Sequence, residues 1–107
     1  MAAGMMYKLK AVEVVRHPVL RLTFTDGLQG EIDLSNDLAN GPAFEPLRDQ
    51  AFFQSVQVEE GGHVFGWRLG EPGREIDFSA DAARADIEQA IVKKLAAEHR
   101  SHKTAAE

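Results

Sequence analysis

The sequence predicts a small α+β domain: a mostly antiparallel sheet of hairpins, a short central helix, and a long C-terminal helix packed on one face. Alternating apolar and polar segments, the glycines and prolines between them, and one final helical repeat predict this class. The length of 107 residues, 44% of them hydrophobic, suits one core. We expect a disordered lead-in at 1–6, the domain at 7–100, and a frayed tail at 101–107.

The first strand is predicted over residues 7–16. Three valines within it favour extended backbone. His17-Pro18 should end the strand, because proline has no N–H for a sheet ladder and restricts the residue before it.

A hairpin is predicted over residues 19–34. A two-residue turn at Asp26-Gly27 would pair Phe24 with Gln29 and mix apolar with polar side chains on one face. A three-residue loop that starts at Thr25 separates the faces and puts Gly27 in the left-handed conformation. The resulting pairs are Phe24 with Leu28, Leu22 with Gly30, Leu20 with Ile32, Thr23 with Gln29, and Arg21 with Glu31.

Shorter elements are expected in the middle of the chain. Residues 35–42 are read as a polar connector, and Pro46 can open a short helix, because proline suits the first helical position. That helix would place Leu47, Ala51 and Phe52 near one side. Three strands are expected at 55–60, 63–69 and 75–78, with a Gly61-Gly62 turn between the first two.

The long helix is predicted over residues 79–100. The Ser79 hydroxyl can accept a hydrogen bond from a free N–H of the first turn, and Asp81 suits the positive helix end. A buried stripe is expected from residues spaced four apart, namely Ala83, Ile87, Ile91 and Leu95.

No catalytic constellation is visible, so we predict no catalytic residues, no metal site and no cofactor. The chain has no cysteine, which excludes disulfides, thiolate nucleophiles and cysteine-ligated zinc. No serine lies in a nucleophile elbow, and the four histidines lack metal-ligand spacing. Glu31 and Asp33 share one strand face and form an acidic patch with Asp26, for which we favour a solvent-exposed hairpin face over a cation or acid–base site.

Charge is unevenly distributed along the chain. Residues 26–90 contain 4 basic and 14 acidic residues, a net charge of −10, whereas residues 1–25 carry +3 and residues 91–107 carry +2. An acidic body repels phosphate backbones, which argues against direct DNA binding, and it can attract a basic protein.

The sequence also bears on location. No apolar run approaches the roughly 20 residues of a membrane helix, and the N-terminus lacks the apolar stretch of a signal peptide. We therefore expect a cytoplasmic protein without a membrane partner.

Several segments together resemble the bacterial family called domain of unknown function 2442. They are LRLTFTDGLQGEIDL at 20–34, GPAFEPLRDQAFFQSVQVEEGG at 41–62, GWRLG at 66–70 and EIDFSAD at 75–81. The resemblance implies a small antiparallel sheet with helices; some relatives carry a helix-turn-helix domain, and others look like halves of two-gene modules of toxin–antitoxin type. No catalytic residues are agreed for the family, so none is carried over. This chain departs from the pattern in a wider gap at 70–74 and in ending after one long helix, without room for a DNA-binding domain.

Three hypotheses of function follow. The favoured one is a non-catalytic interaction module, the antitoxin-like or regulatory half of a two-gene module, that binds a small and basic protein through Asp26, Glu31, Asp33 and Trp67. Trp67, the only tryptophan, is interpreted first as a core or rim anchor, and as a contact residue if it is exposed. The second is a small metal-dependent or acid–base enzyme that uses Asp26, Glu31, Asp33, Asp77 or His63. The third is a nucleic-acid-associated regulator that uses the basic C-terminal helix. A homo-oligomer is compatible with each of them.

Overall fold

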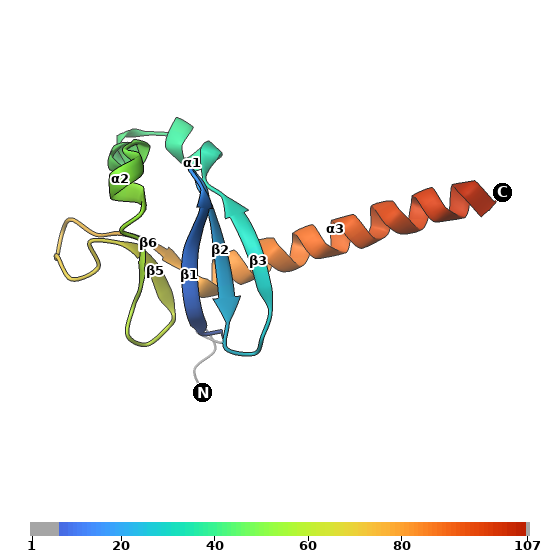
Figure 1. The fold of residues 1–107 in the computed structure, drawn as a ribbon, viewed down its shortest axis with the longest axis horizontal. Helices are drawn as coiled ribbons and strands as arrows, with labels where there is room; N and C mark the ends of the chain where they lie inside the picture. Colours follow the sequence, from blue (N-terminus) through green and yellow to red (C-terminus); the bar gives the residue numbers. More distant parts are fainter. Residues whose placement is uncertain (1–6, 107) are drawn as a thin grey trace.

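The computed structural model describes the backbone of residues 7–106 and the side chains of residues 7–98 (Figure 1). The predicted lead-in at 1–6 lies outside the described residues, and so do the side chains of the predicted tail at 101–107. Two antiparallel sheets of three strands each and a long C-terminal helix confirm the α+β class. The prediction of one sheet was wrong, because the hairpin strands and the later strands form separate ladders.

The first sheet, in the order β1-β2-β3, is formed by β1 (Leu9–Arg16), β2 (Val19–Phe24) and β3 (Gln29–Asp33). The predicted hairpin register is confirmed by four pairs, Leu20 with Ile32, Arg21 with Glu31, Leu22 with Gly30 and Thr23 with Gln29. The Phe24 N–H donates to the Leu28 carbonyl at 2.8 Å. Gly27 has a φ of +96°, as the three-residue loop requires.

The second sheet, in the order β4-β5-β6, is formed by β4 (Gln57–Val58), β5 (Val64–Trp67) and β6 (Ile76–Ser79). The first two of these strands are shorter than predicted, whereas β6 has the predicted length and is shifted by one residue. The sheets meet where the Leu9 N–H donates to the Gly62 carbonyl at 2.7 Å. This bond ties the start of β1 to the turn between β4 and β5.

The segment between the sheets differs from its prediction. Residues expected as a polar connector form α1 (Ser35–Ala39), followed by the 3-10 helix η1 (Pro42–Arg48) and then α2 (Gln50–Phe53). Pro46 lies inside η1 and does not open a helix. Asp49 caps α2 instead, because its carboxylate accepts from the N–H groups of Ala51 at 2.9 Å and Phe52 at 3.2 Å.

The core draws on both sheets and on the helices between them. Its fully buried large side chains are Leu20, Leu22, Phe24, Leu47, Phe53, Phe65 and Trp67. The Trp67 indole N–H donates to the Phe53 carbonyl at 3.0 Å, so the one polar atom of this large side chain has a partner inside the core.

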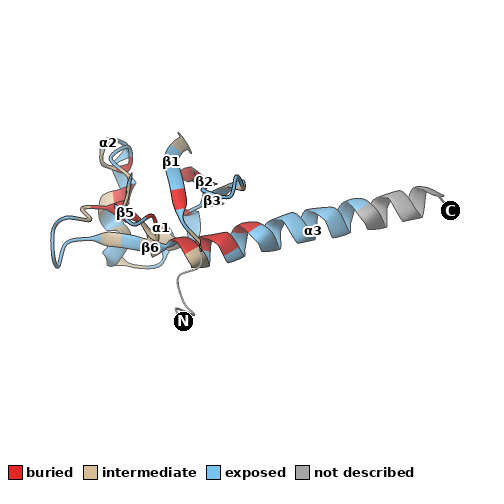
Figure 2. Cartoon of the chain, turned by 90° about the horizontal axis from the view of Figure 1, so that it is seen from below, coloured by how far each residue is buried: buried red, intermediate tan, exposed pale blue. Residues whose placement is uncertain are grey.

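The long helix α3 (Ala80–Ala106) packs on the protein only through its first turns. As predicted, the Ser79 hydroxyl caps it by accepting from the Ala82 N–H at 3.2 Å. Ala83 and Ile87 are buried, but Ile91 is 38% exposed and Leu95 59% exposed, so the prediction of a four-residue buried stripe was wrong at its last two members. Figure 2 shows this change along the helix, from buried turns near β6 to exposed turns beyond the first sheet.

The projecting helix sets the overall shape. The Cα radius of gyration is 16.2 Å, whereas a compact domain of this length has about 13 Å. Figure 1 shows α3 crossing behind the first sheet and continuing past β3. None of the helices in the described part of the chain combines the length and apolar character needed to cross a membrane.

Candidate functional site

Asp26, at the tip of the hairpin, is bound to α3. Its Oδ2 lies 2.9 Å from Arg84 Nη2, and its Oδ1 accepts from Arg84 Nη1 at 3.1 Å and from the Leu28 N–H at 3.2 Å. The hydrogen bond from Arg84, followed by the one from Leu28, lowers the pKa of Asp26 below its usual value. Asp26 therefore joins the hairpin to the helix, which limits its use as a contact for another protein.

Arg84 is a structural residue that the sequence prediction missed. Its side chain is buried and its guanidinium lies over the rings of Tyr7, at 4.3 Å, and Phe24, at 4.9 Å. Its Nε also donates to Glu88 at 2.7 Å. The hydrogen bond to Asp26 is the main reason that the pKa of Arg84 is raised. The burial of Arg84 could have been predicted from sequence, because Arg84 lies three residues before Ile87 and therefore shares its helix face.

Glu31 and Asp33 lie exposed on β3, the edge strand of the first sheet. Arg21 lies between Glu31, at 3.3 Å, and Glu13 on β1, at 3.1 Å, and these hydrogen bonds raise the pKa of Arg21. One cation is thus shared by two carboxylates, which leaves a net negative charge on this face.

Asp33 ends β3 and starts α1. Its Oδ1 accepts from the backbone N–H of Ser35 at 2.8 Å and from the Ser35 hydroxyl at 2.5 Å. These two bonds, the hydroxyl first, lower the pKa of Asp33, so the group stays ionised at neutral pH.

The predicted contact residue Trp67 has 0% exposed surface. It packs against Phe53 with ring centroids 5.2 Å apart. Its interpretation as a core anchor is confirmed, and its inclusion in the contact surface was wrong.

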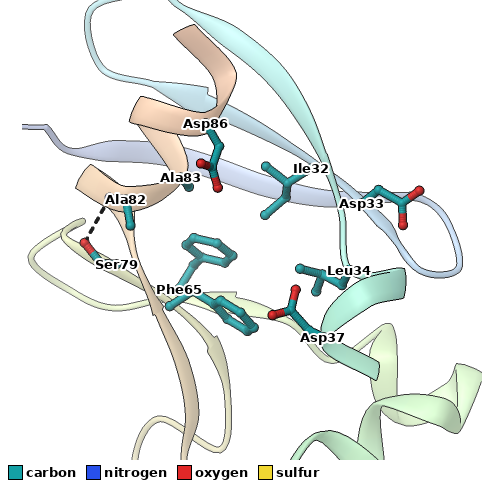
Figure 3. Close-up of a pocket in the computed structure, with 10 residues that line it drawn as sticks. Ile32, Asp33, Leu34, Asp37, Phe65, Ser79, Ala82, Ala83 and Asp86 are labelled. Carbon is teal, nitrogen blue, oxygen red and sulfur yellow. Dashed lines mark hydrogen bonds between the residues drawn. The ribbon is translucent and has the colours of Figure 1, made fainter. Parts of the chain in front are cut away.

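A pocket of about 160 Å³ opens beside Asp33, where β3, α1, the second sheet and the start of α3 meet (Figure 3). Its apolar walls are formed by Ile32, Leu34, Phe65, Phe78, Ala82 and Ala83. The Phe65 and Phe78 rings are stacked, with centroids 5.5 Å apart. Ser79, the cap of α3, completes the wall on the helix side.

Three carboxylates border this pocket, and two of them face it. In Figure 3 the carboxylates of Asp37, on α1, and Asp86, on α3, turn toward the space above the phenylalanine rings, whereas that of Asp33 points away. Among the side chains that the structure describes, no cation forms a salt bridge with Asp37 or Asp86. The pocket therefore combines an apolar interior with negative charge that is not neutralised within the described residues.

The sequence prediction also missed Asp37 and Asp86. Asp37 was placed in a connector, and Asp86 lay within the predicted helix without being assigned a role. One signal was available, because Asp86 follows Ala82 by four residues and Ala83 by three, and so lies on the helix face that borders the core.

The residues of the enzyme hypothesis do not assemble into one site. Asp26 pairs with Arg84, Glu31 with Arg21, and the His63 ring Nδ1 lies 3.0 Å from the Tyr7 carbonyl oxygen. Within residues 7–98, no three His, Cys, Asp or Glu side chains are grouped so that they could hold a metal ion.

Comparison with known proteins gives no further guide, because no family model, no curated protein and no solved structure matches this chain. The resemblance to the domain of unknown function 2442 family stays a prediction.

Proposed function

We propose that this protein is a non-catalytic interaction module that binds a basic protein through an acidic surface. The surface comprises Glu31 and Asp33 on β3, Asp37 on α1 and Asp86 on α3, and is called the acidic face below. Compared with the predicted contact surface, it gains Asp37 and Asp86. It loses Asp26, which is bound to Arg84, and Trp67, which is buried.

The observation that carries the proposal is where the negative charge lies. Asp33, Asp37 and Asp86 come from three elements and border a pocket with apolar walls, and Glu31 lies exposed on β3 two residues before Asp33. A surface of one charge sign next to an apolar recess suits protein recognition, because the charges speed encounter and the recess supplies contact area. The net charge of −10 over residues 26–90 adds to this attraction.

The resemblance suggests where to look for the partner. If the chain works as the antitoxin-like or regulatory half of a two-gene module, the partner is encoded by the neighbouring gene. This extension fails on its own if the neighbouring product does not bind, since a basic partner encoded elsewhere would still satisfy the main proposal.

The test compares capture by two charge-reversed variants. The tagged chain is incubated with native lysate and with the purified neighbouring product, and bound protein is released with salt. We expect one basic protein to be retained by the wild type and lost with Glu31→Lys/Asp33→Lys. The matched control, Glu59→Lys/Glu60→Lys, reverses two exposed charges beside the β4–β5 turn and should retain the partner.

Circular dichroism shows whether each variant is folded. Equal capture by both variants would contradict the proposal, and so would the absence of any protein specific to the wild type.

A further inference from the structure

The size of the pocket beside Asp33 limits what it can accept. Its volume of about 160 Å³ is several times the roughly 30 Å³ that one water occupies in the liquid. It is smaller than the roughly 300–1,000 Å³ of pockets that hold drug-sized ligands. A side chain of a bound protein fits this range, whereas a nucleotide or a large cofactor does not.

The chemistry of the pocket selects for a cation with an apolar stem. Phe65, Phe78 and the alanines of α3 offer no charged group to an occupant, while Asp37 and Asp86 face the space from opposite sides (Figure 3). Asp33 adds to the negative potential, although its Oδ1 already accepts two hydrogen bonds from Ser35. An anion would be repelled, and a neutral apolar group would leave two carboxylates facing it without a counter-charge.

A guanidinium fits these walls better than an ammonium. It is planar and delocalised, so it can lie against Phe78, the partly exposed aromatic side chain of the wall, while its edges donate to carboxylates on two sides. The same chain shows this arrangement elsewhere: the Arg84 guanidinium lies over Phe24 and Tyr7 while it pairs with Asp26 and Glu88. A compact ammonium is more strongly hydrated and loses more on entering an apolar recess.

We infer that this pocket is the seat for one arginine side chain of the basic partner, with Asp37 and Asp86 as the two carboxylates that receive its guanidinium. The inference rests on the proposed function and names the group recognised at the acidic face. Glu31 and Asp33 then attract the partner through their charge, and the pocket anchors it.

The test uses a small probe, so it does not depend on finding the partner. ¹⁵N-labelled protein is titrated with N-acetyl-arginine amide, N-acetyl-lysine amide and N-acetyl-citrulline amide, and backbone amide shifts are followed by NMR. The citrulline compound has nearly the shape of the arginine compound but no charge. We expect saturable millimolar binding of the arginine compound with shifts at Asp37, Ala82, Ala83 and Asp86, weaker binding of the lysine compound, and none of the citrulline compound.

The carboxylates are tested by substitution. Asp37→Asn/Asp86→Asn keeps the shapes and should weaken arginine binding about tenfold or more, because hydrogen bonds to a charged group are the strong ones. The control Glu60→Gln/Glu98→Gln removes two negative charges elsewhere and should leave the affinity within about twofold. Both pairs are at least partly exposed, so each variant should fold.

Three results would overturn the inference: no shift at the pocket amides, equal binding of the citrulline compound, or unchanged affinity in Asp37→Asn/Asp86→Asn. Equal binding of the lysine compound would overturn the preference for guanidinium. If the partner is captured but Asp37→Asn/Asp86→Asn binds it like the wild type, the pocket inference fails while the proposed function stands. If the arginine compound binds as expected but no partner is found, the proposed function fails instead.

Discussion

The two parts of α3 share the same four-residue spacing of apolar side chains but have opposite environments. The first part, from Ala80 to Ile87, is buried at four positions and joins both sheets. The second part continues the same four-residue spacing at Ile91 and Leu95, yet these side chains are 38% and 59% exposed. The spacing determines which side chains share a helix face, but only a surface opposite that face can bury them.

What changes between the two parts is the sheet beneath them. Gly30 on β3 lies under Ile87, and a methyl group at that position would overlap the isoleucine side chain. Beyond Ile87 the helix passes the edge of the first sheet, and residues 88–98 are exposed. The stripe therefore stabilises the fold only as far as the sheet extends.

The sharpest way to test this difference is to truncate the same side chain in each part. Ile87→Ala should lower the free energy of unfolding by about 2–5 kcal/mol, the usual effect of removing a buried aliphatic side chain. Ile91→Ala should change it by less than about 1 kcal/mol, because the side chain is already partly in water. Urea denaturation at one protein concentration measures both, and equal losses would contradict the comparison.

The close approach of helix and sheet can be blocked at Gly30. Gly30→Ala inserts a methyl group against Ile87 and should destabilise the protein by about 1–3 kcal/mol. The control is Gly70→Ala, where an added methyl group meets no atom within 4 Å. If the two alanine variants have the same midpoint in urea, the helix does not depend on this contact.

A third test removes the cation that fastens the docked part of α3 to the hairpin. Arg84→Met keeps most of the side-chain length but leaves Asp26 without its partner, so we expect a loss of about 1–3 kcal/mol. Arg74→Met, which removes an exposed cation 3.9 Å from Glu71, should change stability by no more than about 0.5 kcal/mol. An Arg84→Met variant as stable as the wild type would show that the pairing of Arg84 with Asp26 contributes little to stability.

The smallest expected effect is a dependence on pH. The pKa of Asp26 is lowered in the folded protein, chiefly by Arg84. The pairing therefore contributes fully above the usual aspartate pKa and is lost as the pH falls through the lower folded value. Between about pH 6 and about pH 2, Asp26→Asn should lose less stability than the wild type on acidification. Thermal unfolding across this range gives both curves, and parallel curves would contradict the assignment.

Much of the first sheet could be predicted from sequence because register and side-chain faces are linked. Only one loop length put Phe24 and Leu22 on the apolar face, and that loop required a left-handed Gly27, as observed. The Ser79 cap could be predicted for the same reason, because its hydroxyl accepts from the N–H of Ala82, only three residues further on. Each of these features depends on residues close to one another in the chain.

The acidic face could not be predicted in the same way because distant segments form it. Asp37 and Asp86 come from α1 and α3 and meet across a pocket only after both sheets and helix have packed. Arg84, which lies 58 residues after Asp26 in the chain, forms a salt bridge with it. Trp67 is buried by the segment around Phe53. No local pattern reports such contacts, so the predicted surface retained two residues that the fold uses internally.

The most direct test of the central claim is the salt dependence of association with the captured partner. We expect the association rate constant of the wild type to fall steeply as ionic strength rises, because screening weakens attraction by the acidic face. Glu31→Lys/Asp33→Lys should associate slowly at low salt with a much shallower dependence, while Glu59→Lys/Glu60→Lys stays close to the wild type. Identical salt dependence in the wild type and Glu31→Lys/Asp33→Lys would contradict recognition through the acidic face.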